Sequence, residues 1–385
     1  MNKKKICILT ISLNMGGAER VISLLLKHLV HDYDVSLVLL SDDIEFDIPK
    51  EVKLHVLGKS NILKNKPPLS KLKSTVMFIF KYYRIVKREK FDIAMSFLAL
   101  PNIINSIIAN HVSHKNTHTV ISERCYPSEM YKNGFFSMKM AKIFYPIFYN
   151  KNDRLFSNSV HINEDLKENF GIKIPMNVIY NPIEIIQPKP FKDSYNGNGE
   201  FKLINVGSHS YAKNQQLILR ALKDLDEKVS LTILGTGNLT QNLVDYIEQN
   251  ALKQSINMPG KVVNVDEYLL NSHCFILSSV TEGFPNVLLE AMALGLPVIS
   301  TNCLSGPLEI LNDNEEVNIE DGEFYLGKYG ILINVNDQVA MVKAIKFYRD
   351  NDDVRKLYSD KGYEKAKRYD LPEIYKEVKQ LIDNE

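Results

Sequence analysis

The first half of the chain alternates apolar segments of strand length with amphipathic segments of helix length. Strand-like runs are expected at 6–12, 35–40, 52–57, Ile93–Phe97, 120–123 and 155–157. Between them, 19–30 and 72–86 carry apolar residues at the spacing of a helix. Such alternation predicts buried strands that pair in parallel and are joined through helices. This half is therefore expected to form an α/β domain with helices covering a parallel sheet.

A segment rich in Pro, Gly and Asn at 181–199 interrupts this pattern, and we predict a linker there. The alternation then restarts, with strands expected at 201–207, Val229–Leu234, 274–278 and 297–300 and helices at 215–225 and 243–250. We therefore predict a first domain over 1–185 and a second over 186–369. A last helix at 372–382 is expected to pack back, so that 370–385 joins the first domain. Two such domains commonly enclose a ligand cleft.

The net charge of +1 hides an asymmetry between the two halves. Residues 1–185 hold 26 Lys and Arg against 17 Asp and Glu, which gives +9, and the rest of the chain holds 21 against 29, which gives −8. The first half therefore favours an anionic partner that the second half does not share. The four cysteines show no spacing typical of zinc ligands, which indicates reduced thiols in the cytoplasm.

No apolar run reaches the ~18 residues of a membrane-spanning helix. The apolar start of the chain passes into a charged segment instead of a small-residue cleavage site, so we predict a first strand rather than a signal peptide.

Two carboxylates, Glu282 and Glu290, stand eight positions apart around an apolar run. We expect Glu282 in a loop at the mouth of a buried helix and Glu290 about two turns into that helix. The free N–H groups of the helix start would face the same space, where they could bind an anion such as a nucleotide diphosphate. The carboxylates would bind hydroxyls of a ribose or a hexose.

Three glycine-containing turns follow predicted strands. The segment from Gly207 to Lys213 precedes a helix, and Lys213 could neutralise a phosphate there or simply be a solvated loop residue. The turn at Gly235 and Gly237 is equally well explained as a plain turn. Gly16-Gly17 opens the first helix and allows close approach of a ligand or of backbone, although the pattern is not Gly-x-Gly-x-x-Gly.

Taken together, these segments resemble the retaining glycosyltransferases of the glycogen-synthase-like group (family 4), in particular bacterial enzymes that extend polyprenyl-diphosphate-linked glycans. The resemblance covers nearly the whole chain and is strongest at 16–20, 207–214 and 282–290, where the last segment matches the family's Glu-x7-Glu motif. Ser122-Glu123-Arg124, Asn158-Ser159 and Tyr180-Asn181-Pro182 also match. It implies the GT-B fold, in which two Rossmann-like domains place parallel sheets across a cleft.

The resemblance also implies roles for individual residues. The lysine that matches Lys213 holds the donor diphosphate, the glutamate matching Glu282 faces the donor sugar, and the one matching Glu290 binds the ribose. Lys213 and Glu282 are the expected catalytic residues, Glu123 and Arg124 are expected on the acceptor side, and no metal is expected. The expected donor-binding set is Gly16, Gly17, Gly207, Ser208, His209, Lys213, Gly235, Gly237, Glu282, Gly283, Phe284, Asn286, Val287, Leu288 and Glu290.

Three positions depart from the family pattern. Ser208 stands where the family usually has Arg, so one cationic contact to the donor is missing or supplied from elsewhere. Arg124 replaces a His that often touches the donor sugar, and Leu308 replaces an Arg and cannot supply its charge.

A basic stretch at 59–90 contains ten Lys and Arg and one acid, with aromatic residues between them, and a similar stretch spans 135–151. Basic residues beside aromatics favour an anionic membrane surface. A solvated helix face and nucleic acid are the alternatives, but no nucleic-acid recognition motif accompanies the charge. We expect no nucleic-acid partner and a cytoplasmic protein that is peripheral on the inner face of the cell membrane.

These features predict a metal-independent retaining glycosyltransferase that needs no cofactor beyond its UDP-sugar donor. The implied acceptor is a polyprenyl-diphosphate-linked glycan of surface polysaccharide or glycoprotein assembly, and the implied sugar is an N-acetylhexosamine or galactose. Two alternatives stay open: a nucleotide- or sugar-binding protein without transfer activity, and a sugar-nucleotide epimerase. The metal-linked Asp-x-Asp pattern of the other glycosyltransferase fold occurs at Asp32-Tyr33-Asp34, which we assign to a surface loop.

Overall fold

A computed structural model describes residues 3–383 except Met15, 60–67, 113–116, Asn133, 186–194, Asn196, Asn198 and Glu227. The chain forms two compact units. Unit 1 contains Met1–Pro182 and Leu371–Glu385, and unit 2 contains Ile183–Asp370. Most of the predicted linker, including 186–194, lies outside the described residues.

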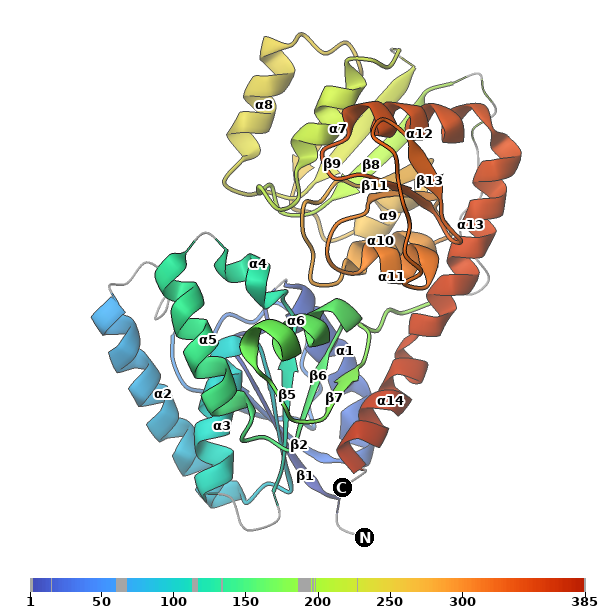
Figure 1. The fold of residues 1–385 in the computed structure, drawn as a ribbon. Helices are drawn as coiled ribbons and strands as arrows, with labels where there is room; N and C mark the ends of the chain where they lie inside the picture. The colour runs from blue at the N-terminus through green and yellow to red at the C-terminus, as the bar shows by residue number, and fades with distance from the viewer. Residues whose placement is uncertain are drawn as a thin grey trace. The chain divides into compact units, whose positions relative to one another are not determined.

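Unit 1 is built on a seven-stranded sheet in which every neighbouring pair is parallel. The strand order is β3-β2-β1-β4-β5-β6-β7 (Figure 1). The strands are β1 (Lys5–Thr10), β2 (Asp34–Leu39), β3 (Lys53–Val56), β4 (Ile93–Phe97), β5 (His118–Glu123), β6 (Arg154–Ser157) and β7 (Met176–Val178).

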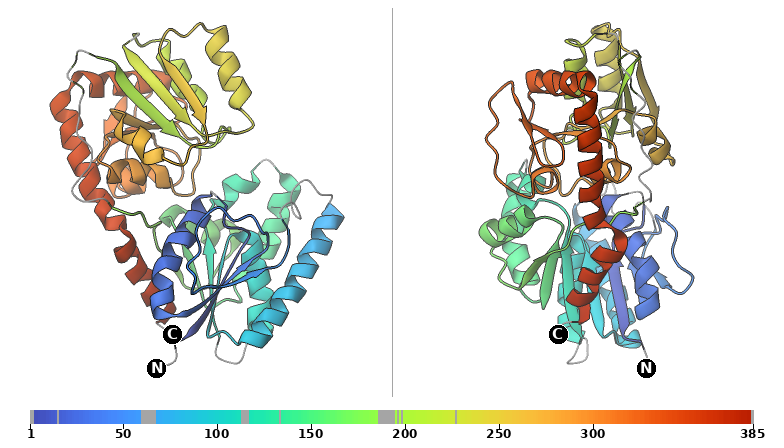
Figure 2. Two further views of the ribbon diagram at one scale, coloured as in Figure 1. Left: turned by 180° about the vertical axis from the view of Figure 1, so that it is seen from behind. Right: turned by 90° about the vertical axis from the view of Figure 1, so that its right-hand side faces the viewer.

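Helices cover both faces of this sheet because its strands are apolar on both faces. In β1, Ile6 and Ile8 pack in one cluster with α1 (Gly17–Asp32) and α14 (Leu371–Asp383). Cys7 and Leu9 pack in another cluster with α2 (Pro68–Glu89) and α3 (Ala99–Val112). The helices of unit 1 are α1 (Gly17–Asp32), α2 (Pro68–Glu89), α3 (Ala99–Val112), α4 (Pro127–Tyr131), α5 (Phe135–Tyr149), α6 (Val160–Phe170) and α14 (Leu371–Asp383). Figure 2 shows α14 ending beside the start of β1, where Lys4 and Asp383 pair at 3.9 Å.

Unit 2 repeats the architecture with a sheet in the order β10-β9-β8-β11-β12-β14-β13. Only β13 runs antiparallel to its neighbour among the described strands. The strands are β8 (Phe201–Val206), β9 (Val229–Leu234), β10 (Ile256–Gly260), β11 (Cys274–Leu277), β12 (Val298–Thr301), β13 (Phe324–Leu326) and β14 (Ile331–Ile333). The helices are α7 (Gln215–Leu222), α8 (Thr240–Gln249), α9 (Val265–Leu270), α10 (Asn286–Ala293), α11 (Pro307–Asn312), α12 (Gln338–Asp350), α13 (Asp352–Ala366) and the 3-10 helix Lys367–Tyr369.

The α/β prediction for both halves is confirmed, and β4 and β9 coincide with the predicted strands. Most other predicted boundaries were wrong by one to a few residues, as three examples show. The first strand ends at Thr10 instead of 12, the helix predicted at 72–86 extends over Pro68–Glu89, and the helix predicted at 215–225 ends at Leu222. The assignment of the Asp-x-Asp pattern to a surface loop was wrong: Asp32 ends α1, Asp34 begins β2, and Tyr33 between them is 4% exposed. Asp32 pairs with Lys379 of α14 at 2.9 Å.

Candidate functional site

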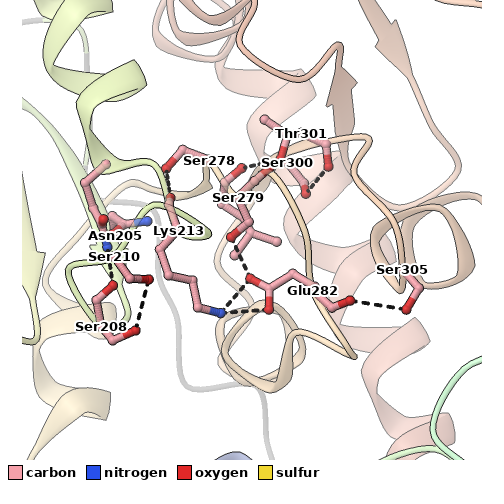
Figure 3. Close-up of polar contacts among 12 residues, drawn as sticks. Asn205, Ser208, Ser210, Lys213, Ser278, Ser279, Glu282, Ser300, Thr301 and Ser305 are labelled. Carbon is pink, nitrogen blue, oxygen red and sulfur yellow. Dashed lines mark hydrogen bonds and ion pairs between the residues drawn. The ribbon is translucent and has the colours of Figure 1, made fainter. Parts of the chain in front are cut away.

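Lys213 and Glu282, which are 69 positions apart in the sequence, meet in an ion pair. The Lys213 ammonium donates to both carboxylate oxygens of Glu282 at 2.7 Å (Figure 3). Lys213 belongs to the loop between β8 and α7, and Glu282 to the loop between β11 and α10. Because β8 and β11 are neighbours in the parallel sheet, their carboxyl ends lie at one edge and bring these loops together.

Two serines that follow β11 hold this pair, and they were absent from the predicted site. Ser279 Oγ donates to Glu282 Oε1 at 2.5 Å, and Ser278 Oγ donates to the carbonyl oxygen of Lys213 at 2.9 Å. Both serines are buried. Their position at a strand's carboxyl end was the available sequence signal, but small hydroxyls there are common enough that it selects nothing by itself.

Backbone contacts fix the loop around Glu282. The N–H of Glu282 donates to the carbonyl oxygen of Leu304 at 2.7 Å, and the N–H of Ser305 donates to the backbone carbonyl oxygen of Glu282 at 3.0 Å. The side chain of Ser305 donates to the carbonyl of Gly283 at 2.6 Å. A Cβ on Gly306 would lie 2.5 Å from Pro285, so this neighbour must be glycine for the two segments to pack. The loop that carries Glu282 is therefore tied by hydrogen bonds to the segment at 304–305.

The predicted position of Glu290 within its helix was wrong. The helix α10 begins at Asn286, so Glu290 lies one turn from its start rather than two. The physical reason is Pro285, whose backbone is not helical (φ −80°, ψ 87°) and which stands outside the helix as its N-cap residue. The buried face was predicted correctly, since Leu288 and Leu289 are fully buried.

The glycine turn after β9 packs directly on the loop that carries Lys213. A Cβ on Gly235 would lie 2.1 Å from the carbonyl oxygen of Gly207, and one on Gly237 would lie 2.2 Å from that of His209. Both positions must therefore be glycine for the two loops to touch, whether or not a ligand also contacts them.

His209 lies under the same turn and is 1% exposed. Its Nδ1 is 2.8 Å from Thr240 Oγ1, and its Nε2 has no partner among the residues that the structure describes. Burial lowers the pKa of this imidazole. Its predicted contact with a donor stays a prediction.

In unit 1, Gly16 and Gly17 stand where predicted, at the start of α1. A Cβ on Gly16 would lie 2.1 Å from Oε2 of Glu19, so the glycine makes room for a carboxylate that folds back over the helix start. Burial raises the pKa of Glu19.

The predicted acceptor-side residues, Glu123 and Arg124, are both buried at the carboxyl end of β5. Glu123 is 1% exposed and accepts hydrogen bonds from the hydroxyl of Tyr149 at 2.8 Å and the N–H of Arg124 at 3.1 Å. Its carboxyl group therefore joins β5 to α5. Burial raises the pKa of Glu123, although these hydrogen bonds oppose the shift.

Arg124 stacks over Phe97 and Phe156, with its guanidinium carbon 5.2 and 4.8 Å from the ring centroids. Its Nη1 donates to Asn181 Oδ1 at 2.8 Å, and its Nε has no partner within the described part of the chain. Burial lowers its pKa to about 9. Arg124 thus connects β5 to the segment just before Pro182, the last residue of this stretch of unit 1.

No three His, Cys, Asp or Glu residues in the described ranges are grouped so that they could hold a metal ion. No described helix is long and apolar enough to span a bilayer.

Sequence comparison decides the family. Residues 187–365 match the model of the family "Glycosyl transferases group 1", and residues 15–186 match that of "Glycosyltransferase Family 4". An N-acetylgalactosamine-N,N'-diacetylbacillosaminyl-diphospho-undecaprenol 4-alpha-N-acetylgalactosaminyltransferase from Campylobacter jejuni is 30% identical over 97% of this chain and 98% of that protein. The chain belongs to the group 1/family 4 glycosyltransferases. A second C. jejuni relative, which extends GalNAc-alpha-(1->4)-GalNAc-alpha-(1->3)-diNAcBac-PP-undecaprenol, is 24% identical over 98% of both chains.

Solved structures agree with this glycosyltransferase in fold. The lipopolysaccharide outer core galactosyltransferase WaaB has a TM-score of 0.73 at 19% identity, covering 99% of both chains. Anabaena HepE in complex with UDP and glucose has a TM-score of 0.76 at 16% identity, covering 99% of this chain and 100% of that one. The predicted GT-B class with two Rossmann-like domains is thereby confirmed.

Ser208, one of the three predicted departures from the family pattern, supplies a hydroxyl group. Its Oγ is exposed and lies 3.4 Å from that of Ser210, in the loop that carries Lys213. The described loop therefore presents two small hydrogen-bonding groups and the ammonium of Lys213.

A pH series tests the burial of Glu123. A carboxyl whose folded pKa lies above its ordinary value of 4.5 stabilises the protein below that value and loses this contribution as pH rises through the folded pKa. Glu123→Gln cannot ionise, so we expect the variant to gain stability relative to the native chain above pH 4.5, by at most about 1.4 kcal/mol per pH unit. Free energies of unfolding from urea titrations at several pH values measure this, and parallel pH curves would contradict it.

Proposed function

We propose that this glycosyltransferase transfers a sugar with retention of anomeric configuration from a UDP-sugar to a polyprenyl-diphosphate-linked glycan, without a metal ion. The observation that carries the proposal is the contact of Lys213 with Glu282, four residues before α10 begins. One ammonium and one carboxylate at the carboxyl edge of a Rossmann-like sheet suit a diphosphate and a sugar hydroxyl.

Nucleotide-sugar chemistry needs little more from the protein. The donor carries its own leaving group, so the site has to orient the reactants and stabilise the charge that develops on the diphosphate. Lys213 would supply a point charge, the first-turn N–H groups of α10 would supply dipoles, and Glu290 would bind the ribose. Glu282 would hold the sugar.

The acceptor assignment draws on the relatives. Both C. jejuni proteins are named for transfer of N-acetylgalactosamine to undecaprenyl-diphosphate-linked glycans. We propose the same acceptor class here, with an N-acetylhexosamine as the first donor to test and galactose as the second.

We also propose that unit 1 docks on an anionic membrane. The helix α2 exposes Leu72, Val76 and Phe80, which are 60%, 57% and 53% accessible. The helix α5 exposes Ile143, Phe144 and Ile147, and both helices pack against α3 (Figure 1). These apolar stripes are accompanied by basic residues, and the Arg84 guanidinium lies 4.3 Å from the Phe80 ring centroid. Apolar residues beside cations favour an anionic bilayer surface. Of the basic stretch, Lys64 and Lys66 lie outside the described residues.

Charged substitutions on α2 should weaken this docking. Val76→Glu with Phe80→Glu removes two apolar side chains, each worth ~1.5–3 kcal/mol when buried, so we expect at least a tenfold loss of vesicle affinity. Sedimentation with vesicles of anionic lipid measures it. Val339→Glu, a matched change at a 56% exposed valine of unit 2, should leave affinity unchanged. Equal affinities for the α2 variant and the native chain would contradict the docking surface.

The activity itself is tested with purified chain, a panel of UDP-sugars and a polyprenyl-diphosphate-linked glycan. The proposal expects glycan extension and UDP release, an α-linkage from an α-linked donor by NMR, and an unchanged rate in EDTA. Saturable UDP-sugar binding with no turnover on any acceptor would favour a binding protein instead. Conversion of a UDP-sugar in the absence of acceptor would favour an epimerase.

A further inference from the structure

The only cation described in the loop between β8 and α7 is already neutralised by a partner within the protein. Lys213 donates to both oxygens of Glu282, and the two side chains are 26% and 6% exposed. A diphosphate that approaches this loop therefore meets an ion pair instead of a free positive charge. Its attraction to Lys213 is offset by its repulsion from Glu282 at nearly the same distance. Binding of an anion here requires the pair to change.

The two members of the pair differ in what else holds them. The carboxylate of Glu282 keeps the hydroxyl of Ser279 at 2.5 Å, and its backbone is bonded on both sides to 304–305. Lys213 is fixed at its backbone by Ser278, but its ammonium ends a flexible stem of four methylene groups that lies over Gly207. Figure 3 shows these contacts. Because the carboxylate has more fixed partners than the amine, the amine can move while the carboxylate stays.

We propose that Glu282 is the resting counter-ion of Lys213 and that an arriving diphosphate takes the ammonium away from it. Ser279 then acts as a positioning residue that keeps the released carboxylate in place for a sugar hydroxyl. This deepens, and rests on, the proposed function. It orders the events at the site: the carboxylate becomes available to the sugar only after the diphosphate has bound. A free sugar finds Glu282 occupied, which makes the diphosphate part of the donor the element that is recognised first.

Removal of an ordinary binding residue weakens ligand binding, whereas the proposed exchange predicts that removal of the Glu282 charge strengthens it. Glu282→Gln removes the competing charge but keeps the shape, so the variant should bind UDP and inorganic pyrophosphate three- to tenfold more tightly than the native chain while losing turnover. Lys213→Met should bind both at least tenfold more weakly. Isothermal titration calorimetry on the full chain measures all three, with thermal unfolding of the free proteins as the check on folding. Unchanged or weaker binding by Glu282→Gln would overturn the proposal.

A double variant separates counter-ion exchange from simple repulsion. If Glu282 acts by occupying the ammonium, Lys213→Met combined with Glu282→Gln should bind pyrophosphate no better than Lys213→Met alone. If Glu282 only repels the ligand, the gain from Glu282→Gln will persist without Lys213, and that result would overturn the exchange.

Ser279→Ala tests the positioning role and the dependence on the proposed function. We expect its UDP dissociation constant within twofold of the native value and its kcat about tenfold lower. If UDP affinity and kcat fall by equal factors, Ser279 only supports the loop. A native chain that binds pyrophosphate but not UDP would contradict the proposed donor, yet leave the effect of Glu282→Gln readable with pyrophosphate. A native chain that binds neither would overturn both proposals.

Discussion

Replacement of Lys213 by Met is expected to reduce kcat/KM for the UDP-sugar by about 10²–10³-fold, the usual loss for one group that stabilises charge in a transition state. The side chain of Met is similar in length, so the change removes the ammonium and little packing. In the described residues the Lys213 ammonium donates hydrogen bonds to Glu282 and to no other group. The substitution therefore breaks this one contact. Steady-state kinetics with a lipid-linked acceptor measure the loss.

Two further variants make this result specific. Lys202→Met removes an exposed lysine from β8 in the same unit and should leave kcat/KM within a factor of two. Lys213→Arg keeps the charge but not the compact ammonium geometry, and it should recover only part of the activity. Full activity of Lys213→Met would remove the diphosphate role from this residue and, with it, the proposed site.

The largest effect on stability is expected at Arg355, whose side chain is 0% exposed in unit 2. Its guanidinium donates to the carbonyl oxygens of Tyr348 and Arg349 at the end of α12 and of Tyr195 before β8. It also stacks over Phe201, 5.6 Å from the ring centroid. Arg355→Ala leaves those buried carbonyls without these donors and opens a cavity, so we expect the free energy of unfolding to fall by about 3–5 kcal/mol.

Hydrogen–deuterium exchange resolves this loss by unit. In Arg355→Ala, exchange should accelerate in α12, α13 and β8, while the helices of unit 1 keep their native rates, because the contacts of the guanidinium lie within unit 2. Lys356→Ala, the exposed neighbour on the same helix, should change neither stability nor exchange. Native-like exchange in Arg355→Ala would show that the buried cation is dispensable.

The architecture of both units could be predicted because it depends on the local spacing of apolar residues. Strands such as β4 and β9 are buried on one or both faces, and consecutive or alternating apolar residues in the sequence indicate this burial. Helix ends were less well predicted, since tertiary contacts and single prolines decide them. The helix α10 begins only after Pro285, which places Glu290 one turn from its start.

The sequence by itself determined two tandem α/β domains and the chemical groups of the candidate site, because periodicity and motif spacing are properties of neighbouring residues. It could not determine which of those groups touch. Only the tertiary structure decided that Lys213 pairs with Glu282, that Ser279 donates a hydrogen bond to this carboxylate, and that Glu123 and Arg124 are buried. The physical reason is that strand order, which brings β8 beside β11, joins loops distant in sequence, and burial depends on what every other element covers.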